Sequence, residues 1–241
     1  MKKILILFSL FIQTLNYAQN TEFGLMLGAS VYTGDIEVSP ANFAPQTSPA
    51  VGIFVRQHVS EKFAVRGLIA IGGVKADEKK YPTSSEREKR GFNFKGTVAE
   101  LSILPEWRPF SLGNVHFLLF AGVNAIYVNP KSNFNDQSSS SSSVVLEDQS
   151  QKYPKIAVGI PIGGGLQWYI NETTALGAEL GMRKTFTDYL DGFSATTNPE
   201  SKDYYVIGGI TFSKFFSLGN DRAGTQRTRY KRRGVNCPSF N

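Results

Sequence analysis

The stretch 156–186 alternates apolar residues with small or polar ones, and it does so on both sides of Asn171-Glu172. Because a period of two places successive side chains on opposite faces, the pattern predicts a β-hairpin with a two-residue turn. Its second face is mostly glycine with a few charges, which suits a crowded interior. An apolar outside with a small, charged inside is typical of a membrane β-barrel. The apolar face comprises Ile156, Val158, Ile160, Ile162, Leu166, Trp168, Leu176, Ala178, Leu180 and Met182.

The same alternation recurs in eight segments of the chain. An even number of strands with apolar outer faces can close into a ring, which leaves no strand edge unpaired in lipid. We therefore predict an all-β fold, an eight-stranded antiparallel transmembrane β-barrel of the bacterial outer membrane. The segments are 22–33, 51–59, 63–73, 96–107, 115–128, the two strands of 156–186, and 203–212.

The connections between these segments alternate between short and long. Outer-membrane barrels have short periplasmic turns and long outer loops, so the pattern places both termini in the periplasm. Outward aromatic residues fall into two groups, as expected for girdles at the two membrane interfaces. The short links are 60–62, 111–114 and Asn171-Glu172; the long ones are about 35–49, 74–91, 130–154 and 188–202. The periplasmic girdle comprises Phe23, Phe63, Trp107, Phe117, Trp168 and Phe212, and the outer one Tyr127, Phe186 and Tyr204.

The N-terminus has the features of a secretory signal peptide. Lys2-Lys3 precedes the apolar run 4–12, and Asn16-Tyr17-Ala18 forms a cleavage site before Gln19. The apolar run is too short to span a membrane, and no later run reaches about 18 apolar residues. The expected organisation is a signal peptide at 1–18, a barrel at 19–216 and a periplasmic tail at 217–241.

Charged residues occupy inward positions of the expected strands. Arg56, Arg66 and Arg183 can there meet Glu100, Glu106 and Glu179. An eight-stranded barrel is just wide enough for side chains to fill, so we interpret these six residues as a paired lumen network. A permeation path is the alternative, although the bore is too narrow for a porin.

The residues that could support catalysis are few. His58 and His116 are the two histidines, both inward and near the periplasmic rim, where Ser60 and Glu106 could complete a Ser-His-acid arrangement. Their spacing does not demand that chemistry, so we expect no enzyme activity. Two histidines and one cysteine give no metal-ligand spacing. Gly163-Gly164-Gly165 lacks the Lys-Ser/Thr of a phosphate loop, so no cofactor is expected.

The positive charge of the chain is concentrated in the tail. The formal net charge is +6, yet the barrel segment alone is close to neutral. An exported chain rarely meets nucleic acid, so acidic lipid or an acidic protein is the better partner. Cys237 is either incidental or used between chains, because an exported cysteine without a partner can form an intermolecular disulfide. The partner-binding candidates are Arg227, Arg229, Lys231, Arg232, Arg233 and Cys237.

Several motifs together resemble one family. They are Glu22-Phe23-Gly24, Tyr32-Thr33-Gly34-Asp35, Arg90-Gly91-Phe92-Asn93-Phe94, Ala99-Glu100-Leu101-Ser102, the run 181–191 (GMRKTFTDYLD) and Cys237-Pro238. Over essentially the whole mature chain the sequence is similar to the PorG family, outer-membrane components of the type IX secretion and gliding machinery. The serine run 138–143 departs from that family. The resemblance implies a non-enzymatic role, tying a periplasmic ring of a lipoprotein and its partner to the outer membrane.

Two functions therefore remain open. One is a structural secretion-system barrel that works through its periplasmic face and tail. The other is a free-standing barrel, of the adhesin or lipid-modifying type, that works through its outer loops. The tail distinguishes them, because a lone barrel has no need for a basic extension past its last strand.

Overall fold

The computed structural model describes residues 21–33, 46–77, 93–133, 155–186, 190 and 203–216. These residues form ten antiparallel strands within one compact unit, Asn20–Phe216. Among them no helix is long and apolar enough to cross a membrane. The strands are β1 Thr21–Thr33, β2 Ser48–His58, β3 Phe63–Asp77, β4 Asn93–Trp107, β5 Ser111–Leu112, β6 Val115–Ala121, β7 Val123–Asn133, β8 Ile156–Tyr169, β9 Thr174–Thr185 and β10 Tyr204–Phe216.

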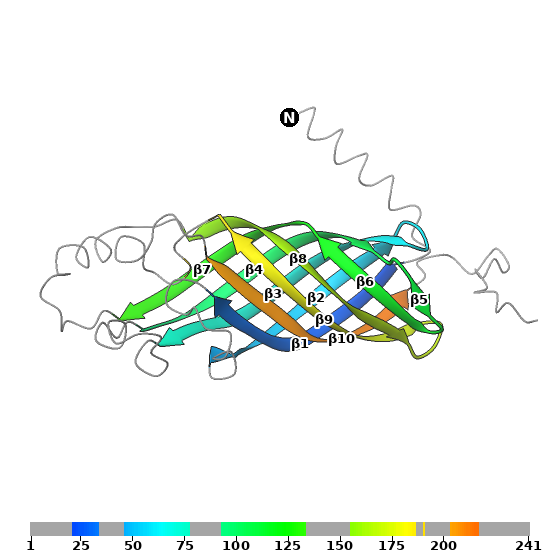
Figure 1. The fold of residues 1–241 in the computed structure, drawn as a ribbon, viewed down its shortest axis with the longest axis horizontal. Coiled ribbons are helices and arrows are strands. Elements are labelled where there is room, and N and C mark those ends of the chain that lie inside the picture. Colours follow the sequence, from blue (N-terminus) through cyan, green and yellow to red (C-terminus); the bar gives the residue numbers. More distant parts are fainter. Residues whose placement is uncertain are drawn as a thin grey trace, which may run out of the picture. The chain divides into compact units, whose positions relative to one another are not determined.

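The strands close into a ring (Figure 1). Consecutive strands pair from β1 to β4 and from β7 to β10, β4 pairs with both β6 and β7, and β1 pairs along its whole length with β10. β6 and β7 are two parts of one strand, since both lie between β4 and β8. β5 is a two-residue extension paired with β6. The predicted all-β, eight-stranded antiparallel barrel is confirmed.

The break between β6 and β7 at Gly122 has a local cause. The Gly122 amide donates to the Pro161 carbonyl at 3.0 Å, and Pro161 has no N–H to return a second bond. Gly122 also lies against β4, where a Cβ would come within 2.0 Å of the Ile103 carbonyl oxygen. The sequence pattern predicted one continuous strand here, because inward and outward positions keep their order across the break.

The stagger of the ring follows from the pairing. Glu22 on β1 pairs with Arg56 on β2, and following the paired residues from strand to strand around the ring leads back to β1 at Tyr32. The ring is therefore staggered by ten residues, from 22 to 32. Eight strands with this stagger tilt by about 40°, so each residue adds about 2.5 Å of height. Phe117 and Tyr127 are ten residues apart along β6 and β7, which separates the two aromatic girdles by about 25 Å.

The outer surface of the ring is apolar between these girdles. Leu27, Ile69, Leu101, Val123 and Ile162 are all more than half exposed there. At one end Phe23, Phe63, Trp107, Trp168 and Phe212 are also exposed, and at the other end Tyr127 and Phe186. A protein in water would bury such a surface, so the exposed face fits a lipid environment.

Two details of the sequence prediction need correction. We call the end of the barrel where β1 begins and β10 ends, at Thr21 and Phe216, the terminal end. At the opposite end β3, β4 and β7 extend several residues farther than expected, to Asp77, Asn93 and Asn133. The turn between β8 and β9 contains four residues, 170–173, rather than two. The Asn171 side chain stabilises it by accepting a hydrogen bond from the Thr173 amide at 2.9 Å.

Candidate functional site

The interior at the terminal end contains a cluster of buried ion pairs, which we call the lower cluster. Arg56 donates through Nε to Glu106 Oε2 at 2.6 Å. Arg66 Nε lies 2.8 Å from Glu106 Oε1, and its Nη1 donates to Glu179 at 2.6 Å. Glu106 therefore lies between two guanidinium groups. Because these groups are buried away from solvent, each carboxylate depends on its arginine to stabilise its charge.

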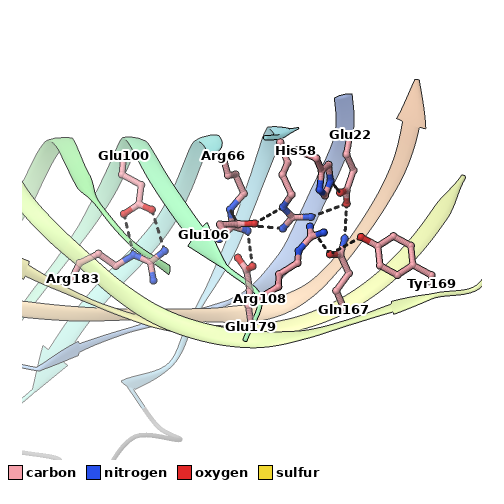
Figure 2. Close-up of polar contacts among 11 residues, drawn as sticks. Glu22, His58, Arg66, Glu100, Glu106, Arg108, Gln167, Tyr169, Glu179 and Arg183 are labelled. Atoms are coloured by element: carbon pink, nitrogen blue, oxygen red, sulfur yellow. Dashed lines mark hydrogen bonds and ion pairs between the residues drawn. The ribbon is translucent and has the colours of Figure 1, made fainter. Parts of the chain in front are cut away.

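Glu22, at the start of β1, also belongs to the lower cluster. Its carboxylate is fully buried and accepts hydrogen bonds from Arg56 Nη1 and Gln167 Nε2, both at 2.7 Å. His58 Nε2 lies 2.9 Å from its other oxygen. Arg108, just beyond β4, donates to Gln167 at 3.1 Å. These contacts connect β1, β2, β4 and β8 across the lumen (Figure 2).

A second group, the upper cluster, lies farther from the terminal end. Arg183 donates to both carboxylate oxygens of Glu100, at 3.2 and 3.3 Å, and also to the Ile207 carbonyl at 3.1 Å. The Tyr205 hydroxyl donates to Glu100 at 2.5 Å, and Asn124 contacts both residues. Figure 2 shows the Glu100–Arg183 pair apart from the lower cluster.

An apolar layer separates the two clusters. On β4 the inward positions between Glu106 and Glu100 are Leu104 and Ser102, both with no exposed surface. Six residues of strand correspond to about 15 Å of barrel height. Met26, Leu68, Leu104, Phe120 and Ile207 belong to one buried apolar cluster in this region. Along the barrel axis the interior thus contains the charged side chains of the lower cluster, then apolar side chains, then the charged side chains of the upper cluster.

Aromatic rings and glycines hold the lower cluster in place. The Arg66 guanidinium lies over the Phe54 and Phe120 rings, 5.4 and 5.0 Å from their centroids. The Phe120 ring needs the space beside Gly163 and Gly181, where a Cβ would come within 2.5 and 2.8 Å of it. The glycine-rich inner face of the central hairpin therefore makes room for one large side chain from β6.

The structure brings all six predicted lumen residues into the barrel interior, each paired with opposite charge. They form two groups instead of one: Arg56, Arg66, Glu106 and Glu179 in the lower cluster, and Glu100 with Arg183 in the upper. With Glu22 and Arg108 added, the two clusters contain four arginines and four glutamates, so their formal charges balance among the described residues.

Glu22 and Arg108, which lie at strand ends, are not among the six predicted lumen residues. Glu22 directly precedes outward Phe23, and Arg108 directly follows outward Trp107. The period of two places both on the inward face: Glu22 is the first residue of the expected segment 22–33, and extending the segment 96–107 by one residue reaches Arg108.

The residues considered for catalysis make contacts of other kinds. Ser60 is in the exposed turn after β2, where its hydroxyl accepts a hydrogen bond from the Phe63 amide. His58 contacts Glu22, and the His116 ring packs edge-on against Tyr169 with centroids 4.9 Å apart. The partner-binding candidates Arg227, Arg229, Lys231, Arg232, Arg233 and Cys237, and the signal segment 1–18, lie outside the described residues.

One part of the run 181–191 is anchored at the far end of the barrel. Leu190 has no exposed surface, and its amide donates to Asp203 Oδ2 at 3.0 Å. Asp203 Oδ1 accepts a hydrogen bond from the Tyr32 hydroxyl at 2.7 Å. The start of β10 and the end of β1 thus fix the position of Leu190.

Solved structures with some likeness to the chain include three outer-membrane or surface proteins. Neisserial surface protein A matches at 8% identity and a TM-score of 0.44, covering 82% of this chain and 96% of that one. OprG from Pseudomonas aeruginosa matches at 13% and 0.44, covering 82% and 97%. A major outer membrane protein from Thermus thermophilus matches at 12% and 0.45, covering 80% and 99%. The fold assignment itself comes from the strand registers above.

A search of the curated proteins found no match. A family model described as a domain of unknown function, DUF6089, matches residues 1–222. That match covers the N-terminal segment and every strand of the barrel. The chain belongs to the DUF6089 family.

Proposed function

We propose that this protein is a structural, non-enzymatic outer-membrane subunit of the type IX secretion and gliding machinery. In this role it anchors the periplasmic ring lipoprotein and its partner to the outer membrane. The proposal draws on the motifs shared with the PorG family, among them Glu22-Phe23-Gly24 and the run 181–191. Neither a substrate nor a cofactor takes part.

The filled interior is the observation that carries the proposal. Two balanced charge clusters and an apolar layer occupy the lumen, so the working surfaces of this barrel are its ends. β1 begins and β10 ends at the same end of the ring, paired as Thr21 with Phe216. The tail 217–241, with most of the net positive charge, therefore continues from that end. We assign this end to the periplasm, where the ring lies.

Basic residues of the tail are the proposed contact with the ring. Arg227, Arg229, Lys231, Arg232 and Arg233 steer an acidic surface of the ring into place, an effect that salt weakens. Cys237 then links the two proteins by an intermolecular disulfide, which the oxidising periplasm permits.

Deletion of residues 217–241 tests the proposal. The ring of strands is complete at Phe216, so the barrel should still insert and migrate differently before and after heating. Secretion of cargo and co-purification of the ring should be lost. Cys237→Ser is the matched control: it should remove a heavier band on a non-reducing gel while keeping the electrostatic contact. Normal secretion by the deletion variant would refute tail docking and favour a free-standing barrel that works through its outer loops.

A further inference from the structure

A row of three lysines crosses the outer face of the barrel at the end remote from the termini. Lys75 on β3 pairs with Lys95 on β4, and Lys95 pairs with Lys131 on β7. Lys95 and Lys131 are exposed and Lys75 is half-buried, and all three occupy outward positions of their strands. Directly opposed residues in an antiparallel pair have Cβ atoms about 5 Å apart. The row is therefore a compact patch of positive charge.

Like charges directly opposite each other destabilise a sheet, so the row needs a negative counterpart. Among the described residues, none forms an ion pair with any of the three lysines. Asp77 lies two residues beyond Lys75 and pairs with Asn93 instead of a lysine, so no acidic residue stands directly opposite a lysine of the row. Its neighbours toward the membrane are Thr97 and Asn129, both exposed and both able to donate hydrogen bonds.

The height of the row identifies the counterpart. Lys131 lies four residues beyond Tyr127 on the same face of β7, which is about 10 Å above the aromatic girdle. Side chains at that height on the outer face of a barrel meet lipid head groups. The row is continuous with the apolar lipid-facing surface below it, where Tyr127 and Val123 are exposed.

We infer that Lys75, Lys95 and Lys131 bind the phosphate groups of a phosphorylated lipid in the outer leaflet, of the lipid A type. Closely spaced ammonium groups match two phosphates on one head group, with Thr97 and Asn129 as additional donors. Bound lipid removes the repulsion within the row and fixes the barrel's height in the membrane. The inference depends on the proposed orientation, in which the termini are periplasmic.

Lipid retention by the full-length protein tests this inference. The protein is placed in phosphatidylcholine nanodiscs with diphosphoryl lipid A, extracted into lipid-free detergent at low ionic strength, and its bound lipid A is quantified by mass spectrometry. Each basic residue near an anionic surface contributes about fivefold to binding, so K75Q/K95Q/K131Q should retain at least about tenfold less lipid A. Lys214 is also outward and exposed, but it lies on β10 at the end of the barrel opposite the row, so Lys214→Gln should retain the wild-type amount of lipid A. So should Lys184→Gln, whose ammonium lies over the Tyr204 ring, 5.7 Å from its centroid.

Two results would overturn the inference. If the triple variant keeps wild-type lipid A, the row serves another partner, such as an acidic protein surface. If inorganic phosphate raises the unfolding temperature of the wild type as much as lipid A does, the row is a simple anion site. Orientation is read separately: Lys95→Cys in a Cys237→Ser background should react with an impermeant maleimide on intact cells. Labelling only after the outer membrane is permeabilised would reverse the orientation and overturn the assignment of the row to the outer leaflet, while the measured lipid A retention would still report whether the row binds phosphate groups.

Discussion

At the scale of single residues, Arg183 makes the ion pair of the upper cluster. It is buried, holds both oxygens of Glu100 and donates to the Ile207 carbonyl. Arg183→Ala would leave the Glu100 carboxylate buried without its cation, at a cost of about 3–5 kcal/mol in the free energy of unfolding. Urea unfolding in detergent, followed by tryptophan fluorescence, measures it. Lys184→Ala, next in sequence but exposed, should change little. Wild-type stability combined with failed secretion would instead make Arg183 a functional residue.

Glu106 and Glu179 are matched carboxylates in the lower cluster. Glu106 contacts both Arg56 and Arg66, whereas Glu179 forms one ion pair among the described residues, with Arg66. Glu106→Gln therefore removes one of the two counter-charges from each of two buried guanidinium groups, Arg56 and Arg66, whereas Glu179→Gln removes one from Arg66 alone. We expect the first variant to be less stable by at least about 1 kcal/mol more than the second. Equal urea midpoints for the two variants would contradict the arrangement described here.

The alternation of the sequence was enough to identify all six of these inward charges, but not how they divide. Which arginine meets which glutamate depends on the register between strands distant in sequence, as for Arg66 on β3 and Glu179 on β9. A period of two fixes the face of a residue and leaves its height undetermined until the ring is closed.

At the scale of strands, the break at Gly122 offers a test of backbone packing. A Cβ at Gly122 would lie 2.0 Å from the Ile103 carbonyl oxygen, whereas one at the lipid-facing Gly67 would meet nothing within 4 Å. Gly122→Ala should thus destabilise the barrel by about 1–3 kcal/mol, and Gly67→Ala should stay within about 0.5 kcal/mol of the wild type. Heat-modifiable gel migration over a temperature series compares them. An unaffected Gly122→Ala barrel would show that β4 can move away from the β6–β7 strand there.

The strand pattern was predictable because each strand has one face in lipid and one in a packed interior. The ends were less predictable, since β3, β4 and β7 continue past the membrane, where Lys75, Lys95 and Lys131 replace the outward apolar residues. The break at Gly122 could not be predicted from the local sequence pattern either, because it arises from Pro161 on a neighbouring strand. Such contacts between strands leave the local alternation unchanged.

At the scale of the whole molecule, the layered interior has a consequence for permeability. Ions passing along the axis would have to cross the lower cluster, the apolar layer around Leu68 and Leu104, and the upper cluster in series. Purified protein in a planar bilayer should give no stepwise current. Glu179→Gln, which loosens only the lower cluster, should also stay silent because the apolar layer remains closed. A barrel that conducts in the wild type would require a water path past Leu104, and the six paired charges would then line a channel rather than fill the lumen.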